Sequence, residues 1–481
     1  MNRRLFAFLQ IARVALLLTW ATDAAAAGAR SADRPNVIFL LTDDQGAWAF
    51  RHAGAREFVT PHLDRLTREG AWFRNAFVAT PVCSPSRLTY LTGRLPSHHG
   101  LQFHLSEGNA SPIRYAERQP TLSQVLADHG YTVGLSGKWH LGGDIEPHAG
   151  FSYWRVLHGV RYKDPDVVKD GRRAPETGFK TDLEAKYALE FIEQNRDRPF
   201  FLYWAANAPH RDYDFQPPQD RAPYLGSSFP SFPRVPVHPW QNPNPQLAGD
   251  HGNEESMLSY AALVTGLDRN LGRVLERLEQ LGLREKTLIV FASDNGYNTG
   301  HHGVWGKGSG TVPFNLYDES IRVPLVWHHP GRITPGRTHD AMVSNYDFFP
   351  SLLDYLGITV PADARRVGRS YVPFLRGETP EWRRSLYFEY AYMRGVRTAS
   401  LKLVERTREW PGEAYDLAAD PGETRNLVRD AAARPRLDAL RAELHGFFAG
   451  IGAPPLADWA TTTSQKHPPY STERLPWYPL Q

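Results

Sequence analysis

Short, almost continuous runs of apolar residues recur along this chain, and stretches with helical spacing separate them. Such runs are typical of strands buried on both faces of a largely parallel sheet, in which helices cross from one strand to the next. The expected strands are 36–42, 131–137, 199–205, 287–293 and 323–329. The expected helices are 60–70, 121–130, 182–195 and 257–282. The pattern predicts an α/β fold with a large mixed, mostly parallel sheet flanked by helices.

A smaller second domain is expected after the main sheet, because 481 residues exceed what one hydrophobic core usually serves. The alternating pattern breaks near residues 375–381. Beyond the break, 385–393 and 395–405 have the spacing of antiparallel strands, and 434–450 has that of an amphipathic helix. We therefore expect a large domain over 34–375 and a C-terminal α+β domain with a Pro-rich tail over 376–481.

The first 27 residues have the composition of a secretory signal peptide. Arg3 and Arg4 provide the positive start, residues 14–21 form the most apolar run, and small residues follow. A membrane anchor is the weaker alternative, because Gln10 and Arg13 interrupt the apolar stretch. We expect removal of residues 1–27 and an exported mature protein, periplasmic or secreted, without a membrane span.

The overall charge gives no sign of a polyanionic partner. The 55 Lys and Arg residues nearly balance the 52 Asp and Glu residues, and the formal net charge is +3. A protein that binds nucleic acid usually carries a marked basic excess. We therefore expect no nucleic-acid partner, and any attraction for an anion must be local.

The chain has a single cysteine, Cys83, although an exported protein could use disulfides. An inert, buried thiol is the common fate of a lone cysteine. Here, however, the sequence from Pro85 to Arg87 predicts a turn that leads into a short helix ending at Thr92. A helix N-terminus beside a guanidinium is a place where an anion or an activated nucleophile is stabilised.

Polar side chains follow four of the expected strands. Because the carboxyl ends of parallel strands meet at one edge of a sheet, these side chains are expected to lie together. They are Asp43 and Asp44, Lys138 and His140, Asn207 and His210, and Asp294 and Asn295.

An all-oxygen set of this kind is suited to a hard divalent cation. Asp43, Asp44, Asp294 and Asn295 would repel one another as bare groups, and Ca²⁺ or Mg²⁺ removes the repulsion, whereas zinc prefers Cys and His. Positive side chains and imidazoles beside such a cation suit a tetrahedral oxyanion ester and proton transfer. These are Arg87, Lys138, Lys307, His140 and His210. Singly, each residue also has an ordinary explanation as a helix cap, a turn or a solvated side chain.

Five segments in order resemble the motifs of the formylglycine-dependent sulfatases. "CSPSRLTYLTGR" resembles their C-x-P-x-R signature, and "GYTVGLSGKWHLG" resembles their second signature. "NVIFLLTDDQG", "FASDNG" and "HHGVWGKG" are similar to their metal and lysine segments. The resemblance runs from about residue 36 to residue 427 and implies an alkaline phosphatase-like fold, with 34–375 as the catalytic domain.

The resemblance implies a role for each matching residue. Cys83 would be oxidised to formylglycine by a separate maturation enzyme that reads C-x-P-x-R in the unfolded chain. Ca²⁺, rather than Mg²⁺, would be held by Asp43, Asp44, Asp294 and Asn295 and would touch the modified Cys83. The substrate-binding residues would be Arg87, Lys138, His210 and Lys307. Arg87 would steady the formylglycine hydrate and His140 would act as a base, while His210 and Lys307 would help the alcohol to leave.

The expected function is therefore that of an exported sulfatase that hydrolyses sulfate monoesters, most of all those of sulfated carbohydrates. Two alternatives remain open: an arylsulfatase of broad specificity, and a phosphonate or phosphate monoester hydrolase of the same superfamily. A silent glycan-binding protein would require the loss of a site residue, and none of the expected positions is lost. One departure from the family pattern is the longer segment after Lys307, where Asp318 precedes Glu319.

Two groups of residues are candidates for recognition of the substrate beyond its sulfate. The Pro-rich stretch 211–253 is too long for an ordinary connection and predicts a lid or a rim. Its aromatic residues could stack on sugar rings or could equally cover the core: Tyr213, Tyr224, Phe232 and Trp240. Loop residues near the motifs could line the subsite beyond the sulfate: His98, His99, His104, His301, His302 and Trp305.

Overall fold

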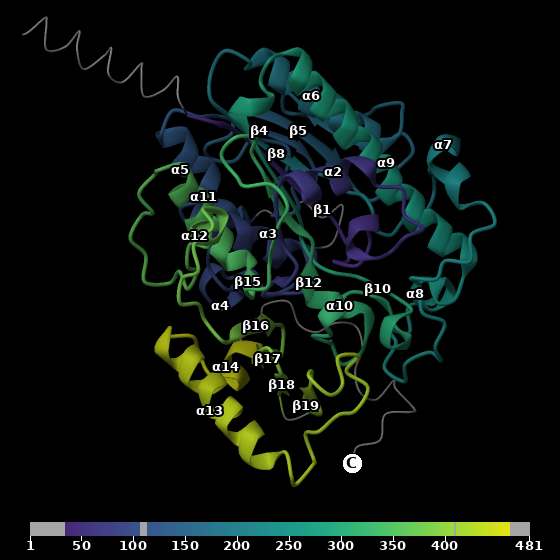
Figure 1. The fold of residues 1–481 in the computed structure, drawn as a ribbon, viewed down its shortest axis with the longest axis vertical. Coiled ribbons are helices and arrows are strands. Elements are labelled where there is room, and N and C mark those ends of the chain that lie inside the picture. Colours follow the sequence, from purple (N-terminus) through teal and green to yellow (C-terminus); the bar gives the residue numbers. More distant parts are fainter. Residues whose placement is uncertain (1–33, 106–112, 408–409, 462–481) are drawn as a thin grey trace, which may run out of the picture.

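The computed structural model describes residues 34–105, 113–407 and 410–461, and its central layer is one large sheet with helices on both faces (Figure 1). The expected signal peptide and the end of the Pro-rich tail, 462–481, lie outside the described residues. The sheet contains ten strands in the order β14-β2-β13-β9-β1-β8-β4-β5-β6-β7. The predicted large mixed sheet is therefore confirmed.

Five neighbouring strands in the middle of the sheet run parallel. They are β9 (Thr287–Ser293), β1 (Asn36–Thr42), β8 (Phe200–Ala205), β4 (Thr132–Gly137) and β5 (Tyr153–His158). The first four are strands that the apolar runs predict. The remaining predicted strand, β13 (Leu325–His328), pairs with β9 in the antiparallel direction. The flanking strands are β2 (Ala71–Phe73), β14 (Arg337–His339), β6 (Asp166–Lys169) and β7 (Arg172–Pro175).

Side chains of the central strands alternate between two hydrophobic cores, one on each face of the sheet. Ile38 and Leu40 of β1 lie in the core that contains the apolar faces of three helices. These are α2 (Pro61–Glu69), α6 (Lys180–Gln194) and α9 (Glu254–Gln280). Phe39 and Leu41 lie in the other core. Its helices are α3 (Cys83–Thr92), α5 (Leu122–Asp128) and α11 (Phe348–Tyr355).

Helix α9 begins three residues before the predicted start at Met257. Asn253 caps it, because its side-chain oxygen accepts hydrogen bonds from the backbone N–H groups of Glu255 at 2.9 Å and Ser256 at 3.3 Å. The acidic first turn further favours this start. The apolar periodicity alone could not locate the cap.

A separate four-stranded antiparallel sheet lies below the main sheet in Figure 1, next to α13 (Arg434–Gly450). Its strands are β16 (Leu386–Tyr390), β17 (Met393–Arg397), β18 (Leu401–Arg406) and β19 (Glu413–Asp416). The prediction of two strands over 385–393 and 395–405 was wrong, because the chain reverses at Ala391, whose φ is 51°, and again after Arg397. The domain boundary at residue 375 stays a prediction.

Glu389 at the end of β16 joins this sheet to both flanks of α3. Its backbone N–H donates to Ala79 O at 2.9 Å, and its carbonyl accepts from Thr80 Oγ1 at 2.7 Å. Its fully buried carboxylate accepts from Ser97 N at 2.8 Å and from Arg394 Nη2 at 2.7 Å. The C-terminal sheet thus holds the segments directly before and after the helix that begins at Cys83.

We expect Glu389→Ala to lower the free energy of unfolding by about 3–5 kcal/mol, because it leaves Arg394 buried without this carboxylate. Urea unfolding measures the change. The matched control is Glu405→Ala in β18, whose carboxylate pairs with Arg441 at 2.7 Å in a partly exposed position. That change should cost less than about 1 kcal/mol. An equal loss of unfolding free energy in the two variants would contradict the role of Glu389 in joining the C-terminal sheet to the segments around α3.

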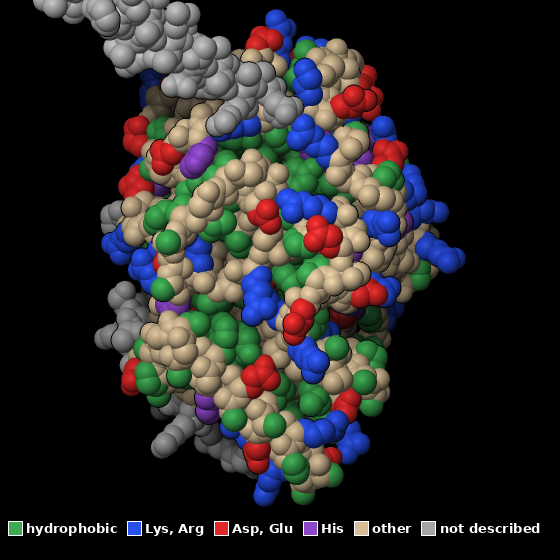
Figure 2. Space-filling model, turned by 60° about the vertical axis from the view of Figure 1, so that its left-hand side comes forward, with side chains coloured by type: hydrophobic (Ala, Val, Ile, Leu, Met, Phe, Trp, Pro, Cys, Tyr) green, Lys and Arg blue, Asp and Glu red, His purple; other side chains and the backbone are tan. Residues whose placement is uncertain are grey.

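Charged side chains of both signs are interspersed over the face shown in Figure 2, which agrees with the small net charge. Within the described part of the chain, no helix combines the length and the apolar character needed to cross a bilayer.

Candidate active site

The carboxyl ends of the central parallel strands bring the predicted polar residues to one edge of the sheet. Asp43 directly follows β1, and its N–H donates to Ala208 O at 3.2 Å in the segment after β8. Asp294 follows β9, and its N–H donates to Thr42 O at 2.9 Å. Lys138 follows β4 and donates from its N–H to Ala205 O at 2.7 Å. Backbone pairing between adjacent strands therefore fixes the relative positions of these side chains.

Cys83 is the first residue of α3 and is only 2% exposed. Its Sγ lies 3.2 Å from Asp43 Oδ1 and 2.8 Å from Lys307 Nζ. The helix includes the segment from Pro85 to Arg87, for which the sequence predicted a turn. Proline is tolerated in the first turn of a helix, where its missing N–H needs no intrahelical partner.

Three carboxylates surround the thiol. Ligand atoms of Asp43, Asp44, Asp294 and Cys83 all lie within 4.8 Å of one another, and all four residues are buried. Asn295 Nδ2 donates to Asp44 Oδ1 at 2.7 Å, while its buried Oδ1 has no hydrogen-bond partner among residues 34–105, 113–407 and 410–461. An unpartnered amide oxygen beside three carboxylates is a donor set that fits a hard divalent cation.

Three cationic side chains balance the three carboxylates. Arg87 is fully buried and donates from Nε to Asp294 Oδ2 at 2.8 Å and from Nη2 to Asp43 Oδ2 at 3.2 Å. Lys138 Nζ lies 2.7 Å from Asp43 Oδ2, and Lys307 Nζ lies 2.6 Å from Asp44 Oδ1. The hairpin of β10 (Asn298–Thr299) and β11 (Trp305–Gly306) delivers Lys307, so the longer segment after this lysine does not displace it.

The environment separates the acidities of the two aspartates that contact Arg87. Burial alone would raise the pKa of Asp43, but the charges of Lys138, His210 and Arg87 lower it well below its usual value. Burial and the neighbouring Asp43 raise the pKa of Asp294 to about 7. Burial and Asp43 also raise the pKa of the Cys83 thiol well above its usual value. The unmodified thiol is therefore protonated at neutral pH and is a poor nucleophile.

The two predicted catalytic histidines are held by backbone carbonyl groups. His210 Nδ1 donates to Arg211 O at 2.7 Å, which leaves Nε2 facing Asp44 Oδ2 at 3.8 Å. His140 Nε2 donates to Leu105 O at 2.6 Å, and its predicted role as a base is not tested by this contact. Asp44, two residues after β1, and His140, three residues after β4, have φ values of 66° and 58°. Such left-handed backbone in residues other than glycine is strained and concentrates at functional sites.

Several predicted subsite residues instead pack within the protein. His98 contacts the carbonyl oxygens of Arg365 and Ile451, each at 3.0 Å, and buried His99 contacts Thr89 Oγ1 at 3.2 Å. Trp305 is fully buried. The prediction that these three line a subsite was wrong, because their side chains are taken up by packing and backbone contacts. The His301 ring lies 4.8 Å from that of Trp48 in a tilted contact, and exposed His104 stays a candidate.

The Pro-rich stretch 211–253 forms part of the core and part of the surroundings of Lys307. Tyr224 and Phe232 are buried in a cluster of aromatic side chains, so they cover the core and do not stack on sugars. Tyr213 also packs against this cluster. Trp240 is partly exposed, and its backbone carbonyl accepts a hydrogen bond from Val312 N at 2.7 Å. Val312 lies five residues after Lys307 in the chain. The rim prediction therefore remains for this part of the stretch.

Sequence reasoning missed Tyr260, a fully buried residue of α9 that supports the segment after β1. Its hydroxyl donates to Asp44 O at 2.9 Å and accepts from Gly46 N at 3.1 Å. Tyr260 is more than two hundred positions from Asp44 in the chain, and its local pattern is that of any core-facing helix residue. Only the packing of α9 against β1 reveals the contact.

His302 joins a buried ionic cluster instead of a sugar subsite. Its Nε2 lies 2.6 Å from Glu319 Oε2, and its ring stacks on Tyr317 at 4.1 Å. Glu423 lies within reach of the same two side chains, and both of its oxygens are already occupied, by Lys402 Nζ at 2.6 Å and Asp318 N at 2.7 Å. Lys402 therefore supplies the neutralising charge that a metal would otherwise provide.

We expect this cluster to make stability pH-dependent. Burial would lower the pKa of His302, but the hydrogen bond and charge of Glu319 raise it above its usual value of 6.5. A raised pKa contributes stability that is fully present below pH 6.5 and is lost as the pH rises through the folded-state pKa. The loss should appear in free energies of unfolding measured from pH 6 upward, and His302→Gln should remove it. His445→Gln, in an exposed pair with Glu405, is the control. An unchanged pH slope in His302→Gln would refute this assignment.

The match to known proteins covers most of the chain. The sulfatase family model matches residues 35–358, and the model of the N-sulphoglucosamine sulphohydrolase C-terminal region matches residues 300–448. The N-acetylglucosamine-6-O-sulfatase of Bacteroides thetaiotaomicron is 29% identical, over 83% of each chain. Arylsulfatase A of Homo sapiens is 29% identical, over 88% of this chain and 90% of that protein.

The solved structure of another protein, in complex with that protein's substrate D-glucosamine-2-N,6-O-disulfate, superposes on this chain with a TM-score of 0.76 and 27% sequence identity. The superposition covers 87% of this chain and 98% of that chain. Together with the family model, which matches more than half of the chain, this likeness establishes both the fold and the class of enzyme. The chain belongs to the sulfatase family and is a sulfuric ester hydrolase.

Proposed function

We propose that this sulfatase removes sulfate from sulfated carbohydrates and that it does so with a formylglycine made from Cys83 and a bound Ca²⁺. The observation that carries the proposal is the position of Cys83, whose Sγ lies 3.2 Å from Asp43 and 2.8 Å from Lys307. At this position a nucleophile is next to both the carboxylate cluster and the cations that a sulfate group requires.

The raised pKa of Cys83 supports its conversion before use. A thiol nucleophile would leave a sulfated enzyme that water must cleave by attack at sulfur. Formylglycine, as its hydrate, supplies one hydroxyl to attack sulfur and a second whose collapse to the aldehyde expels sulfate by carbon–oxygen cleavage. The maturation enzyme would oxidise Cys83 and recognise Pro85 and Arg87 in the unfolded chain, because folding buries all three residues.

The carboxylate cluster is the proposed metal site. Asp43, Asp44, Asp294 and Asn295 would hold Ca²⁺, with Mg²⁺ the less favoured ion, and the ion would supply positive charge to a sulfate oxygen. The oxygen donors and the unpartnered Asn295 Oδ1 support this assignment.

The cationic residues would bind the sulfate and orient the nucleophile. Arg87, fixed by Asp43 and Asp294, keeps its positive charge next to the modified residue. Lys138 Nζ pairs with Asp43 Oδ2, the oxygen that Arg87 Nη2 also contacts, and would contact the sulfate. His140 would accept the proton of the second hydroxyl when the covalent intermediate breaks down.

His210 and Lys307 would act on the leaving alcohol. The Arg211 carbonyl accepts from His210 Nδ1, so Nε2 is the nitrogen left for the substrate, and in the imidazolium form its N–H would donate to the leaving oxygen. Burial would lower the pKa of Lys307, but Asp44 raises it well above its usual value, so the ammonium can donate a proton or a hydrogen bond. A sugar alcohol is a poor leaving group, and such donation matters more for it than for a phenol.

A substrate panel tests the proposal. We expect the highest kcat/KM on a sulfated monosaccharide or oligosaccharide, below it an aryl sulfate, and little turnover of an aryl phosphate or a phosphonate monoester. The relatives that act on sulfated glucosamines support this order. Highest kcat/KM on the aryl sulfate would favour the arylsulfatase alternative, and highest kcat/KM on the phosphonate would favour the phosphonate or phosphate monoester hydrolase.

Determining the N-terminus of the exported protein tests removal of residues 1–27.

A further inference from the structure

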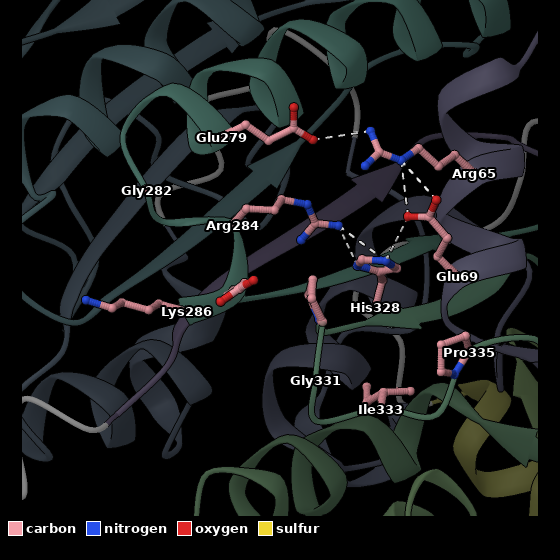
Figure 3. A pocket seen from close by; sticks show the side chains of 12 residues that line it. Arg65, Glu69, Glu279, Gly282, Arg284, Lys286, His328, Gly331, Ile333 and Pro335 are labelled. Atoms are coloured by element: carbon pink, nitrogen blue, oxygen red, sulfur yellow. Dashed lines mark hydrogen bonds and ion pairs between the residues drawn. The ribbon is translucent and has the colours of Figure 1, made fainter.

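A groove of about 640 Å³ is lined by residues that flank the start of β9 and the end of β13 (Figure 3). Strand β9 connects this groove with the candidate active site, because Arg284 and Lys286 line the groove just before the strand, and Asp294 follows its other end. Seven residues of strand span roughly 20 Å. The groove is therefore a separate place on the molecule.

Arg284 is the unusual residue of this groove. Its Nη2 donates to His328 Nδ1 at 2.5 Å, and its buried Nη1 has no hydrogen-bond partner among the residues that the structure describes. Across the part of the chain that the structure describes, no carboxylate lies within ion-pair distance of this guanidinium. Arg65, in contrast, pairs with Glu69 at 3.1 Å and with Glu279 at 3.2 Å, as the dashed lines in Figure 3 show.

The partner of Arg284 carries no negative charge. Burial and the charge of Arg284 lower the pKa of His328 to about 3, so the imidazole is neutral. Burial and the neighbouring Arg65 lower the pKa of Arg284 itself to about 10, which leaves it protonated at neutral pH. A largely buried cation without a carboxylate partner is costly, and an oxyanion in the groove beside this guanidinium would balance its charge.

The other walls limit which anion fits. Glu69, Glu279 and Glu285 also line the groove and would repel a polyanionic chain. Pro330 and Ile333 offer apolar contact to the carbon part of a small ligand. The combination suits a molecule with one anionic group.

We propose that this groove is an anion-binding site anchored by Arg284, which takes a single sulfate-type oxyanion, either free or attached to a small sugar. The site does not depend on the chemistry proposed for Cys83, so it can fail or hold independently of the proposed function. Its ligand would contact the guanidinium of Arg284 and the apolar wall of Ile333.

Equilibrium dialysis of the full-length mature protein tests the site with two probes, inorganic sulfate and glucosamine 6-sulfate. The Cys83→Ala background prevents turnover. In this background we expect Arg284→Gln to weaken binding of a probe at the groove by about tenfold or more. Arg196→Gln, at an exposed arginine 3.5 Å from Asp197, should leave binding unchanged. If Arg284→Gln loses binding of inorganic sulfate, the free ion is a ligand of the groove. If it loses binding of glucosamine 6-sulfate alone, the ligand is the sugar sulfate ester.

Hydrogen exchange keeps the test decisive if Arg284→Gln is unstable. Either probe should slow exchange in a peptide that covers residues 281–289 of the otherwise intact protein. Binding that is equal in the Arg284 and Arg196 variants, or protection confined to the segments around Cys83, would overturn the proposal.

Discussion

Replacing Cys83 by alanine should lower kcat for sulfate ester hydrolysis by about 10⁴-fold or more, the effect of removing an essential nucleophile. The change removes only the sulfur, which lies between Asp43 and Lys307, and leaves every backbone hydrogen bond of α3 in place. The protein should therefore keep its fold, with a Tm close to that of the parent. Steady-state kinetics on the best sulfated sugar and a thermal unfolding curve measure the two effects.

The matched control is Ser86→Ala, which keeps Cys83, Pro85 and Arg87 and removes a buried hydroxyl of the same helix. Its kcat should stay within about tenfold of the parent, because Ser86 Oγ contacts Asn345 and not the carboxylate cluster. A mass spectrum of the peptide that contains Cys83, from a host with the maturation enzyme, measures the conversion. Active protein with only unmodified thiol, or a Cys83→Ala variant with substantial activity, would show that the nucleophile is misassigned.

Most of the central sheet is predictable from periodicity. β1, β8 and β9 are buried along their whole length, so their composition shows no amphipathic alternation and stands out from the helices. The turn at Ala391 is different, because the apolar residues continue through it and only the backbone φ of 51° marks the reversal. A run of apolar residues therefore indicates burial more reliably than it indicates strand length.

The candidate site is predictable where backbone topology alone brings residues together. Asp43 and Asp294 follow adjacent parallel strands and must be neighbours, whereas the position of Lys307 rested on resemblance to the family. Tyr260 and Glu389 could not be predicted, because each acts through tertiary contacts with distant segments and has no local pattern of its own. The histidines after the motifs are the opposite case: their position in the sequence suggested a subsite, but the side chains of His98 and His99 contact other parts of the protein.

Metal removal should have the second large effect. We expect a chelator to lower kcat by about 10³-fold and Ca²⁺ to restore it, because the sulfate would lose the charge that faces its oxygens. Calcium at a hundred times its Kd should also stabilise the folded protein by about 2.7 kcal/mol, seen as a rise in Tm. Zn²⁺ should restore less activity, because three carboxylates and an amide oxygen favour a harder ion.

Variants separate this site from a general effect of calcium on the protein. Asn295→Leu removes the amide oxygen that has no partner in the structure, so it should weaken the calcium response of both Tm and kcat. Asp268→Asn changes another buried acid, one that does not belong to the cluster and accepts from the N–H groups of His62 at 3.1 Å and Leu63 at 2.7 Å. It should lower the starting Tm but leave the calcium-dependent rise intact. Equal calcium responses in the parent and in Asn295→Leu would exclude Asn295 as a ligand. A parent enzyme indifferent to chelation would exclude the metal site itself, because the carboxylates would then be balanced by Arg87, Lys138 and Lys307 alone.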